Sequence, residues 1–413
     1  MSTRRPGRSG RRVLVFVSLL LALVAAGCGG DTQVTPGSFQ GLSSQDRLTR
    51  GQEAVRAFVS ALNARDEAAY DKAIDPRFAA RLTPVLANAE AIGVSRIAAE
   101  YVDSLPGSLD ADEHEEYGDQ AWVASVRLTY RTRIDDATSR HETALVLTPE
   151  GDRARVAAIG GHEQRSPLWL TGPVQVAGQG AVSILNAGTG ATSRYLRLAQ
   201  QAVREVRAVL PRWDGRLVIE VPRDKEALDA TLAAEPDTYA NIAAVTTTAD
   251  GTLVPGAPVH VYLNPRVFAT LKHRGAQVVI SHEATHVATQ ASFASMPLWL
   301  LEGFADQVAL RAADVPVHQA ARQVIARMRK EGLPTGLPTP ADLEPTAEGL
   351  GATYEEAWLA CRFLADTWGE HAMVRFYETV NDGAAIGTAF RTVLGIGEKE
   401  FVERWRADLS SLL

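Results

Sequence analysis

The sequence contains little cysteine, little lysine and no excess of basic charge. Cys28 and Cys361 are the only cysteines in 413 residues, which excludes a small scaffold held together by several disulfides. Residues 28–413 carry 37 basic and 49 acidic side chains, a formal charge of −12. A chain this acidic is not expected to bind nucleic acid, because neutralising phosphates requires a basic face. The 46% hydrophobic and 22% charged residues that are present are typical of a globular protein with one or two cores, and they exclude extended disorder.

The N-terminus has the layout of a secretory signal peptide over residues 1–27. Five arginines, with no acidic residue among them, precede the fifteen-residue apolar run Val13–Gly27. That run is short for a membrane-spanning helix, which needs roughly 20 apolar residues, although an uncleaved single-span anchor is the alternative. The next residues, 28–44, are rich in glycine, serine, threonine and glutamine, a composition that predicts a flexible tether.

The end of the signal, Ala25-Ala26-Gly27-Cys28, resembles the lipobox of bacterial lipoproteins. In those proteins small residues precede a cysteine that receives a diacylglyceryl group and becomes the new N-terminus. The resemblance implies a lipid anchor on Cys28, and therefore a place on the extracytoplasmic face of a bacterial cell membrane. The other cysteine, Cys361, alternates with apolar residues in a predicted helix and is interpreted as a small buried hydrophobe.

Residues 45–172 are predicted to begin with helices and to end in an antiparallel sheet, because the period of the apolar residues changes from 3.6 to 2. The first helix starts near Gln45, two more cover Glu67–Ile74 and Arg77–Val102, and the strands are Trp122–Ile134, His141–Thr148 and Arg153–Ile159. The first of these strands is predicted to be half-buried. Helices followed by a curved meander resemble the NTF2-like cone fold. The resemblance implies a ligand-binding cone or a docking module, beside the simpler interpretation as a spacer or accessory domain.

Residues 173–413 are predicted to form a second domain, with a small sheet followed by a mostly helical half. A helix is predicted over residues 191–210, and strands over Arg216–Val221, Ile242–Thr248 and Val259–Asn264. After Pro265 almost the whole chain has helical periodicity. The fold class predicted for the entire chain is therefore α+β.

One short motif carries the chemistry. The segment Ser281-His282-Glu283-Ala284-Thr285-His286 contains HExxH within a predicted helix. A spacing of four residues places both imidazoles on one helical face, as two nitrogen ligands of a tetrahedral zinc ion require. Glu283 follows the first histidine, where its carboxylate can take a proton from a water molecule on the metal. A chance HExxH on an ordinary helix is the alternative.

The segment Pro297–Asp306 is predicted to start a second helix, since proline is tolerated in a first turn. It carries Glu302, sixteen positions after His286. HExxH followed by WLxEGFAD resembles the gluzincin clan of zinc metallopeptidases, most of all the bacterial peptidase MA-like families. The resemblance implies that His282, His286 and Glu302 bind one Zn²⁺ per chain, and that Asp306 accepts the spare N–H of His282. The chain departs from thermolysin-like enzymes in the shorter spacing before Glu302 and in Leu301, which replaces an asparagine.

Two imidazoles and one carboxylate leave a fourth position for water, whose proton Glu283 would take and then deliver to the leaving amine. Tyr354 and His318 are candidate donors to the developing oxyanion, with Tyr354 preferred, and each also fits a structural role. The strand Val259–Leu263 is a candidate edge for pairing with an extended substrate. His260, within that strand, is interpreted as a surface residue.

These expectations describe a membrane-tethered, extracytoplasmic zinc metallopeptidase that acts on a peptide or protein in the cell envelope. The main alternative is a lipoprotein binding or scaffold module whose zinc site is structural or degenerate, and a narrower one is hydrolysis of a cell-wall peptide amide. The presence of Glu283 favours the enzyme, because a structural zinc site has no need of a base.

Overall fold

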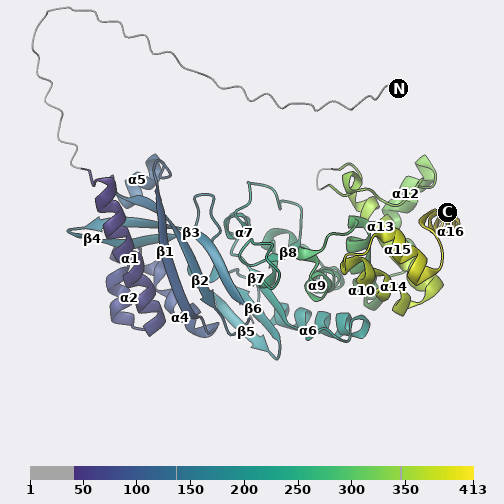
Figure 1. Ribbon diagram of the computed structural model, residues 1–413, viewed down its shortest axis with the longest axis horizontal. Coiled ribbons are helices and arrows are strands. Elements are labelled where there is room, and N and C mark those ends of the chain that lie inside the picture. Colours follow the sequence, from purple (N-terminus) through teal and green to yellow (C-terminus); the bar gives the residue numbers. More distant parts are fainter. Residues whose placement is uncertain (1–40, 136, 345–346) are drawn as a thin grey trace, which may run out of the picture. The chain divides into compact units, whose positions relative to one another are not determined.

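The computed structural model describes residues 41–135, 137–344 and 347–413. The signal peptide predicted for residues 1–27, the lipidation predicted at Cys28 and nearly all of the predicted tether lie outside the described residues. No helix among the described residues combines the length and the hydrophobicity needed to cross a membrane. The fold is α+β, as predicted: helices and an antiparallel sheet come first, followed by a mixed sheet and a helical C-terminal half (Figure 1).

The first two helices form where the sequence predicts them. α1, Ser44–Ala64, begins at a capping box in which the Ser43 hydroxyl accepts a hydrogen bond from a backbone N–H of the first turn. α2, Glu67–Ala73, follows after a short turn. The buried face of α1, which includes Phe58 and Leu62, packs against the first sheet (Figure 1).

The helix predicted over Arg77–Val102 is wrong in its second half. The segment forms a 3-10 turn, two short helices and a strand, in the order Pro76–Phe78, α3 (Ala79–Leu82), α4 (Pro84–Ala91) and β1 (Ser95–Leu105). Gly93, at φ +64°, adopts the left-handed conformation that ends helices. β1 contains several helix-favouring residues, but its pairing with β2 decides the outcome, because strand formation depends on neighbours that are distant in sequence.

The first sheet is an antiparallel meander in the order β1-β2-β3-β4. Its later strands are β2 (Trp122–Arg131), β3 (Thr138–Glu150) and β4 (Arg153–Ile159). One face packs against α1, α2 and α4, and the other is covered at Val123 by Tyr117 at the end of α5, Ala111–Tyr117. The first half of β2 is therefore buried on both faces, where the sequence predicts one buried face. The NTF2-like resemblance rests on this order of elements and stays a prediction.

The second sheet is mixed, in the order β5-β6-β7-β9-β8. Its strands are β5 (Gln175–Gln179), β6 (Val182–Asn186), β7 (Leu217–Val221), β8 (Ala244–Thr248) and β9 (Val259–Leu263), with α6 (Thr192–Val209) between β6 and β7 and α7 (Lys225–Leu232) after β7. β8 and β9 form within the predicted strands Ile242–Thr248 and Val259–Asn264, and they pair antiparallel. The prediction that Val259–Leu263 is a sheet edge is wrong, because this strand pairs with β7 on one side and with β8 on the other. The edge strand on this side of the sheet is β8, and β5 is the edge on the other side.

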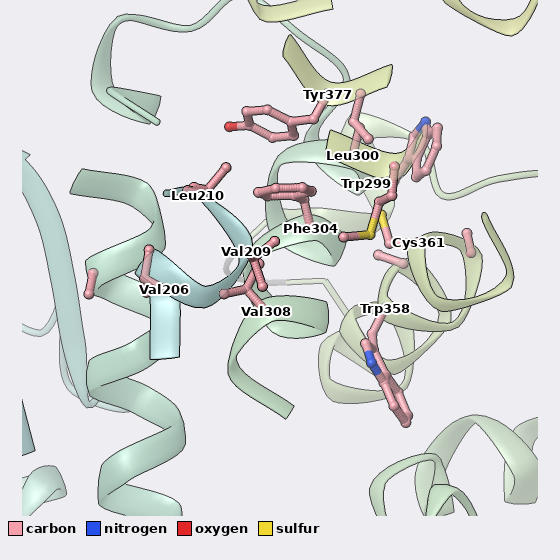
Figure 2. Close-up of a cluster of buried hydrophobic side chains, with 14 of the residues drawn as sticks. Val206, Val209, Leu210, Trp299, Leu300, Phe304, Val308, Trp358, Cys361 and Tyr377 are labelled. Atoms are coloured by element: carbon pink, nitrogen blue, oxygen red, sulfur yellow. The ribbon is translucent and has the colours of Figure 1, made fainter. Parts of the chain in front are cut away.

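The C-terminal half is helical, as predicted, and its long helices share one core. They are α9 (His273–Ala288), α10 (Leu298–Ala313), α13 (Leu350–Trp368), α14 (Glu370–Asn381) and α16 (Glu398–Ser410). Figure 2 shows Phe304 of α10 between Val209 of α6 and Tyr377 of α14, and the ring centroids of Phe304 and Tyr377 are 4.2 Å apart. Cys361 lies in the same cluster and is fully buried, which confirms its interpretation as a small hydrophobe.

A buried ionic cluster joins the first sheet to the second. His260 of β9 lies between two carboxylates: its Nδ1 is 2.7 Å from Glu220 Oε1 of β7, and its Nε2 is 2.9 Å from Asp135 Oδ1, in the segment after β2. All three side chains are buried. The interpretation of His260 as a surface residue is therefore wrong, since the segment after β2 covers this face of β9. Residues 42–413 form one compact unit, and the predicted boundary at residue 172 falls between β4 and β5.

The two carboxylates determine the charge of His260. Burial by itself lowers the pKa of His260, but the charges and hydrogen bonds of Asp135 and Glu220 outweigh burial and raise it to about 10, from an ordinary 6.5. For Asp135, burial raises the pKa, and the interactions with His260 outweigh that effect and lower it. The cluster is therefore a buried imidazolium between two carboxylates, and removing His260 leaves two buried carboxylates without the cation between them.

We expect His260→Gln to lower the free energy of unfolding by about 3–5 kcal/mol near pH 6, because two buried carboxylates lose the cation between them. Asp135 keeps the Thr132 hydroxyl and the charge of Arg216. The histidine of the wild type contributes its full stabilisation below pH 6.5 and loses it as the pH rises towards about 10. The difference between wild type and variant should therefore shrink over that range. Urea unfolding with a metal chelator present, at pH 6 and pH 10, measures it. His318→Gln, at an exposed position, is the control, and a pH-independent difference would contradict the assignment.

Candidate metal centre

His282 and His286 lie one turn apart on α9 and direct the same ring atom towards each other. Their Nε2 atoms are 3.0 Å apart, and their ring planes are nearly perpendicular, at 87°. His286 is buried and His282 nearly so. Two nitrogen atoms of one helix are thus directed at a common point, as the HExxH spacing predicts.

α10 brings Glu302 to the same point from a second helix. Gln290, at φ 53°, ends α9, and Pro297 precedes the first turn of α10, so the chain reverses within a few residues. Glu302 Oε2 then lies 3.3 Å from His282 Nε2 and 3.5 Å from His286 Nε2. Among the described residues, these two histidines and Glu302 form the one cluster of histidine, cysteine or acidic side chains that could hold a metal ion.

These three atoms fit the ligand positions of a tetrahedral metal ion. Nitrogen and oxygen ligands about 2.0–2.1 Å from zinc are separated from each other by roughly 3.3 Å along each edge of the tetrahedron. The observed separations of 3.0, 3.3 and 3.5 Å bracket that value. The residues therefore fit three of the four ligand positions of the Zn²⁺ that the gluzincin resemblance implies.

Asp306 lies one turn beyond Glu302 and contacts the other side of His282. Its Oδ1 is 2.8 Å from His282 Nδ1. When Nδ1–H donates to this carboxylate, Nε2 keeps its lone pair for a metal. His286 has no such support, because its Nδ1 is buried without a hydrogen-bond partner in the part of the chain that the structure describes. The orientation of the histidine pair therefore depends on Asp306 on one side and on packing on the other.

The carboxylates make this site favourable for positive charge. Burial lowers the pKa of His282, but Asp306 and Glu302 outweigh burial and raise it well above its usual value of 6.5. Burial likewise raises the pKa of Glu302, and the two histidines outweigh that effect and hold it well below its usual range. A divalent cation at the point where the ligand atoms meet would satisfy the same charges.

Glu283 is the carboxylate of the motif that does not join the three converging groups. Its side chain is buried, and its Oε2 accepts a hydrogen bond of 2.6 Å from the hydroxyl of Thr246, on the edge strand β8. A carboxylate that is fixed but not a ligand is available to accept and release a proton. The sheet edge thus contacts the helix that carries the motif.

Of the two candidate oxyanion donors, the structure brings Tyr354 towards the site and leaves His318 apart. Tyr354 of α13 is half-buried; burial raises its pKa, and the negative charges of Glu302, Asp306 and Glu283 raise it further. The phenol is therefore protonated and can donate a hydrogen bond. His318 is exposed on α11, Val317–Ala320, and among the described residues no contact is found between His318 and the histidine pair.

Two residues that support the site were not identified from the sequence, namely Thr246 and Gly303. Thr246 carries no local signal, because its role arises from a contact 37 positions along the chain. Gly303 stands within WLxEGFAD, but only the packing against α13 shows why a glycine is needed there. An added Cβ would be 3.0 Å from Cys361 Sγ and closer still to the Ala357 carbonyl group. The glycine allows α10 and α13 to approach closely, and Glu302 is its neighbour in sequence.

We expect Asp306→Asn to weaken zinc binding by about 10–100-fold, because an amide orients His282 less strongly than a carboxylate does. Competition against a chromogenic chelator measures the affinity. Asp314→Asn is the matched control, since Asp314 is exposed at the end of the same helix in a conformation that asparagine also favours. An unchanged affinity in Asp306→Asn would contradict the role given to this carboxylate.

We expect Gly303→Ala to lower the free energy of unfolding by about 1–3 kcal/mol, because the added methyl group overpacks the contact between α10 and α13. Zinc affinity should fall as well, since Glu302 shifts with the helix. Gly275→Ala in α9 is the control: its Cβ would meet only Leu271, at 3.9 Å, and the alanine favours a helix. Thermal unfolding and metal competition test both variants, and equal behaviour of the two would exclude the close-packing explanation.

Comparison with known proteins adds no family to this description. The chain matches no protein-family model, and no curated protein matches it at a significant level. The roles of the site residues therefore depend on their geometry: three converging ligand atoms, a supporting carboxylate and a separate, fixed glutamate.

Proposed function

We propose that this protein is a zinc-dependent metallopeptidase. One observation carries the proposal: three ligand atoms converge, one short of a tetrahedral set, and Glu283, on the same helix as the histidines, is held by Thr246 outside the ligand set. A purely structural zinc site is closed by four protein ligands and has no use for such a glutamate. The alternative of a binding or scaffold module lacks an explanation for Glu283.

In the proposed reaction, each residue has one task. A bound zinc ion supplies a Lewis acid that polarises the peptide carbonyl and lowers the pKa of a water molecule. His282, His286 and Glu302 hold the ion, and Asp306 fixes the orientation of His282. Glu283 accepts the proton of the attacking water and passes it to the leaving amine. Tyr354, whose phenol is influenced by the charges of Glu302, Asp306 and Glu283, is the proposed donor of a hydrogen bond to the oxygen on which charge develops.

The substrate class follows from the edge of the second sheet. On the side of the sheet next to α9, the edge strand is β8 and not Val259–Leu263, and β8 contacts α9 through Thr246 and Glu283. An extended peptide can pair with such an edge through main-chain hydrogen bonds, which favours a protein or peptide over a globular small molecule. We place the enzyme in the cell envelope, anchored through Cys28, because of the signal and lipobox pattern in the sequence. A cell-wall peptide amide is the narrower alternative substrate.

We expect Glu283→Gln to bind one zinc ion per chain, like the wild type, and to lose hydrolysis by about 10²–10⁴-fold, because the amide cannot accept the proton. Metal content is measured beside cleavage of a mixed peptide library and of peptidoglycan fragments. The same change at an exposed position, Glu348→Gln, is the control.

Cleavage of peptides by the wild type and by Glu348→Gln, but not by Glu283→Gln, supports the proposal. Cleavage of peptidoglycan fragments alone moves the substrate to a cell-wall amide. If all three proteins bind zinc and none cleaves any substrate, the binding-module alternative replaces the peptidase.

A further inference from the structure

Thr246 connects the proposed base to the free edge of the sheet. Its Oγ1 lies 2.6 Å from Glu283 Oε2 and 3.3 Å from the main-chain oxygen of Glu283, and no other hydrogen bond to this carboxylate is found among the described residues. The hydroxyl has one hydrogen, and the shorter contact directs it to one carboxylate oxygen and leaves the other carboxylate oxygen free. Because Glu283 is buried, water contributes little to its orientation, and Thr246 determines which way the free oxygen points.

The main chain of Thr246 points the other way, out of the sheet. In an antiparallel pair, every second residue bonds to its partner strand, and the residues between them direct their N–H and C=O groups outward. Asn264 N–H donates to Ala243 O, and Ala249 N–H donates to Pro258 O, so the odd-numbered residues of this segment bond to β9. Thr246 opposes Val261 and belongs to the outward set.

Thr246 can therefore act in two ways, through its side chain and through its main chain. Its side chain lies on the face of β8 that meets α9, and its main-chain N–H and C=O lie along an edge that pairs with no strand within the described residues. An extended peptide on this edge would bond to the main chain of the same residue whose hydroxyl orients the base.

We propose that Thr246 is a positioning residue, which orients the Glu283 carboxylate through its hydroxyl while its main chain aligns the backbone of an extended polypeptide substrate. The proposal rests on the peptidase function proposed above. It predicts that the hydroxyl affects the rate of the chemical step, whereas the main chain affects binding. A side-chain substitution should therefore change kcat and leave KM nearly constant.

The test compares Thr246→Val, which removes the hydroxyl and keeps the shape, with Thr246→Ser, which keeps the hydroxyl. Thr247→Val is the matched control, because Thr247 is the next residue, on the opposite face, and no hydrogen bond of its hydroxyl to the described residues is recorded. We expect kcat of Thr246→Val to fall by about 10–100-fold, with KM and zinc affinity within about a factor of two. Thr246→Ser should recover most of the rate, and Thr247→Val should resemble the wild type.

Two kinetic results would overturn the proposal while leaving the peptidase in place. One is an unchanged kcat in Thr246→Val. The other is a serine variant as slow as the valine variant, which would assign the effect to packing of the methyl group.

Crystal structures of the wild type, Thr246→Val and Thr246→Ser provide a readout that does not need activity. The Glu283 carboxylate should rotate away from its wild-type position in the valine variant and keep it in the serine variant. An identical orientation in all three structures overturns the positioning role. If the wild type cleaves no peptide, the proposed function fails, and the crystal structures still decide whether Thr246 fixes Glu283.

Discussion

The site depends above all on the close packing of α10 between its neighbours. Glu302 and Asp306 reach the histidines of α9 only because α10 lies at a fixed depth between α6, α9, α13 and α14. Gly303 sets that depth on the side of α13, and the stacked rings of Phe304 and Tyr377 set it on the side of α14. Protein cores tolerate little change in volume, so this packing converts a sequence spacing of sixteen residues into ligand separations near 3.3 Å.

Much of the site could be predicted from the sequence because its parts are local. HExxH needs only one helix, and the pair Glu302 and Asp306 needs only the next. The same reasoning failed where distant segments decide. Ser95–Leu105 is a strand because β2 lies beside it, His260 is buried because the segment after β2 covers it, and Thr246 matters because β8 is an edge. Sequence spacing contains no information on which strand of a sheet lies outermost.

Two histidines of this chain lie between carboxylates and yet suit different purposes. His260 uses both ring nitrogens on Asp135 and Glu220, so no lone pair remains and the imidazolium form is stabilised. His282 uses Nδ1 on Asp306 and meets Glu302 at Nε2, beside a second histidine. The difference lies in the neighbour of Nε2: a carboxylate alone stabilises a proton, whereas a further nitrogen at 3.0 Å favours a metal ion.

The open edge of β8 has a consequence for the solubility of the protein. An unpaired strand edge is a template on which other copies of a chain can build a continuous sheet, and aggregation often begins there. Here the strand has five residues, and the carbonyl of Thr248 is already bonded to Arg165 and to the N–H of Gly251. The main chains of Ala244 and Thr246 and the N–H of Thr248 are the outward bonding positions left within the strand. An opening this short admits one guest segment, but it is a poor nucleus for a growing fibre.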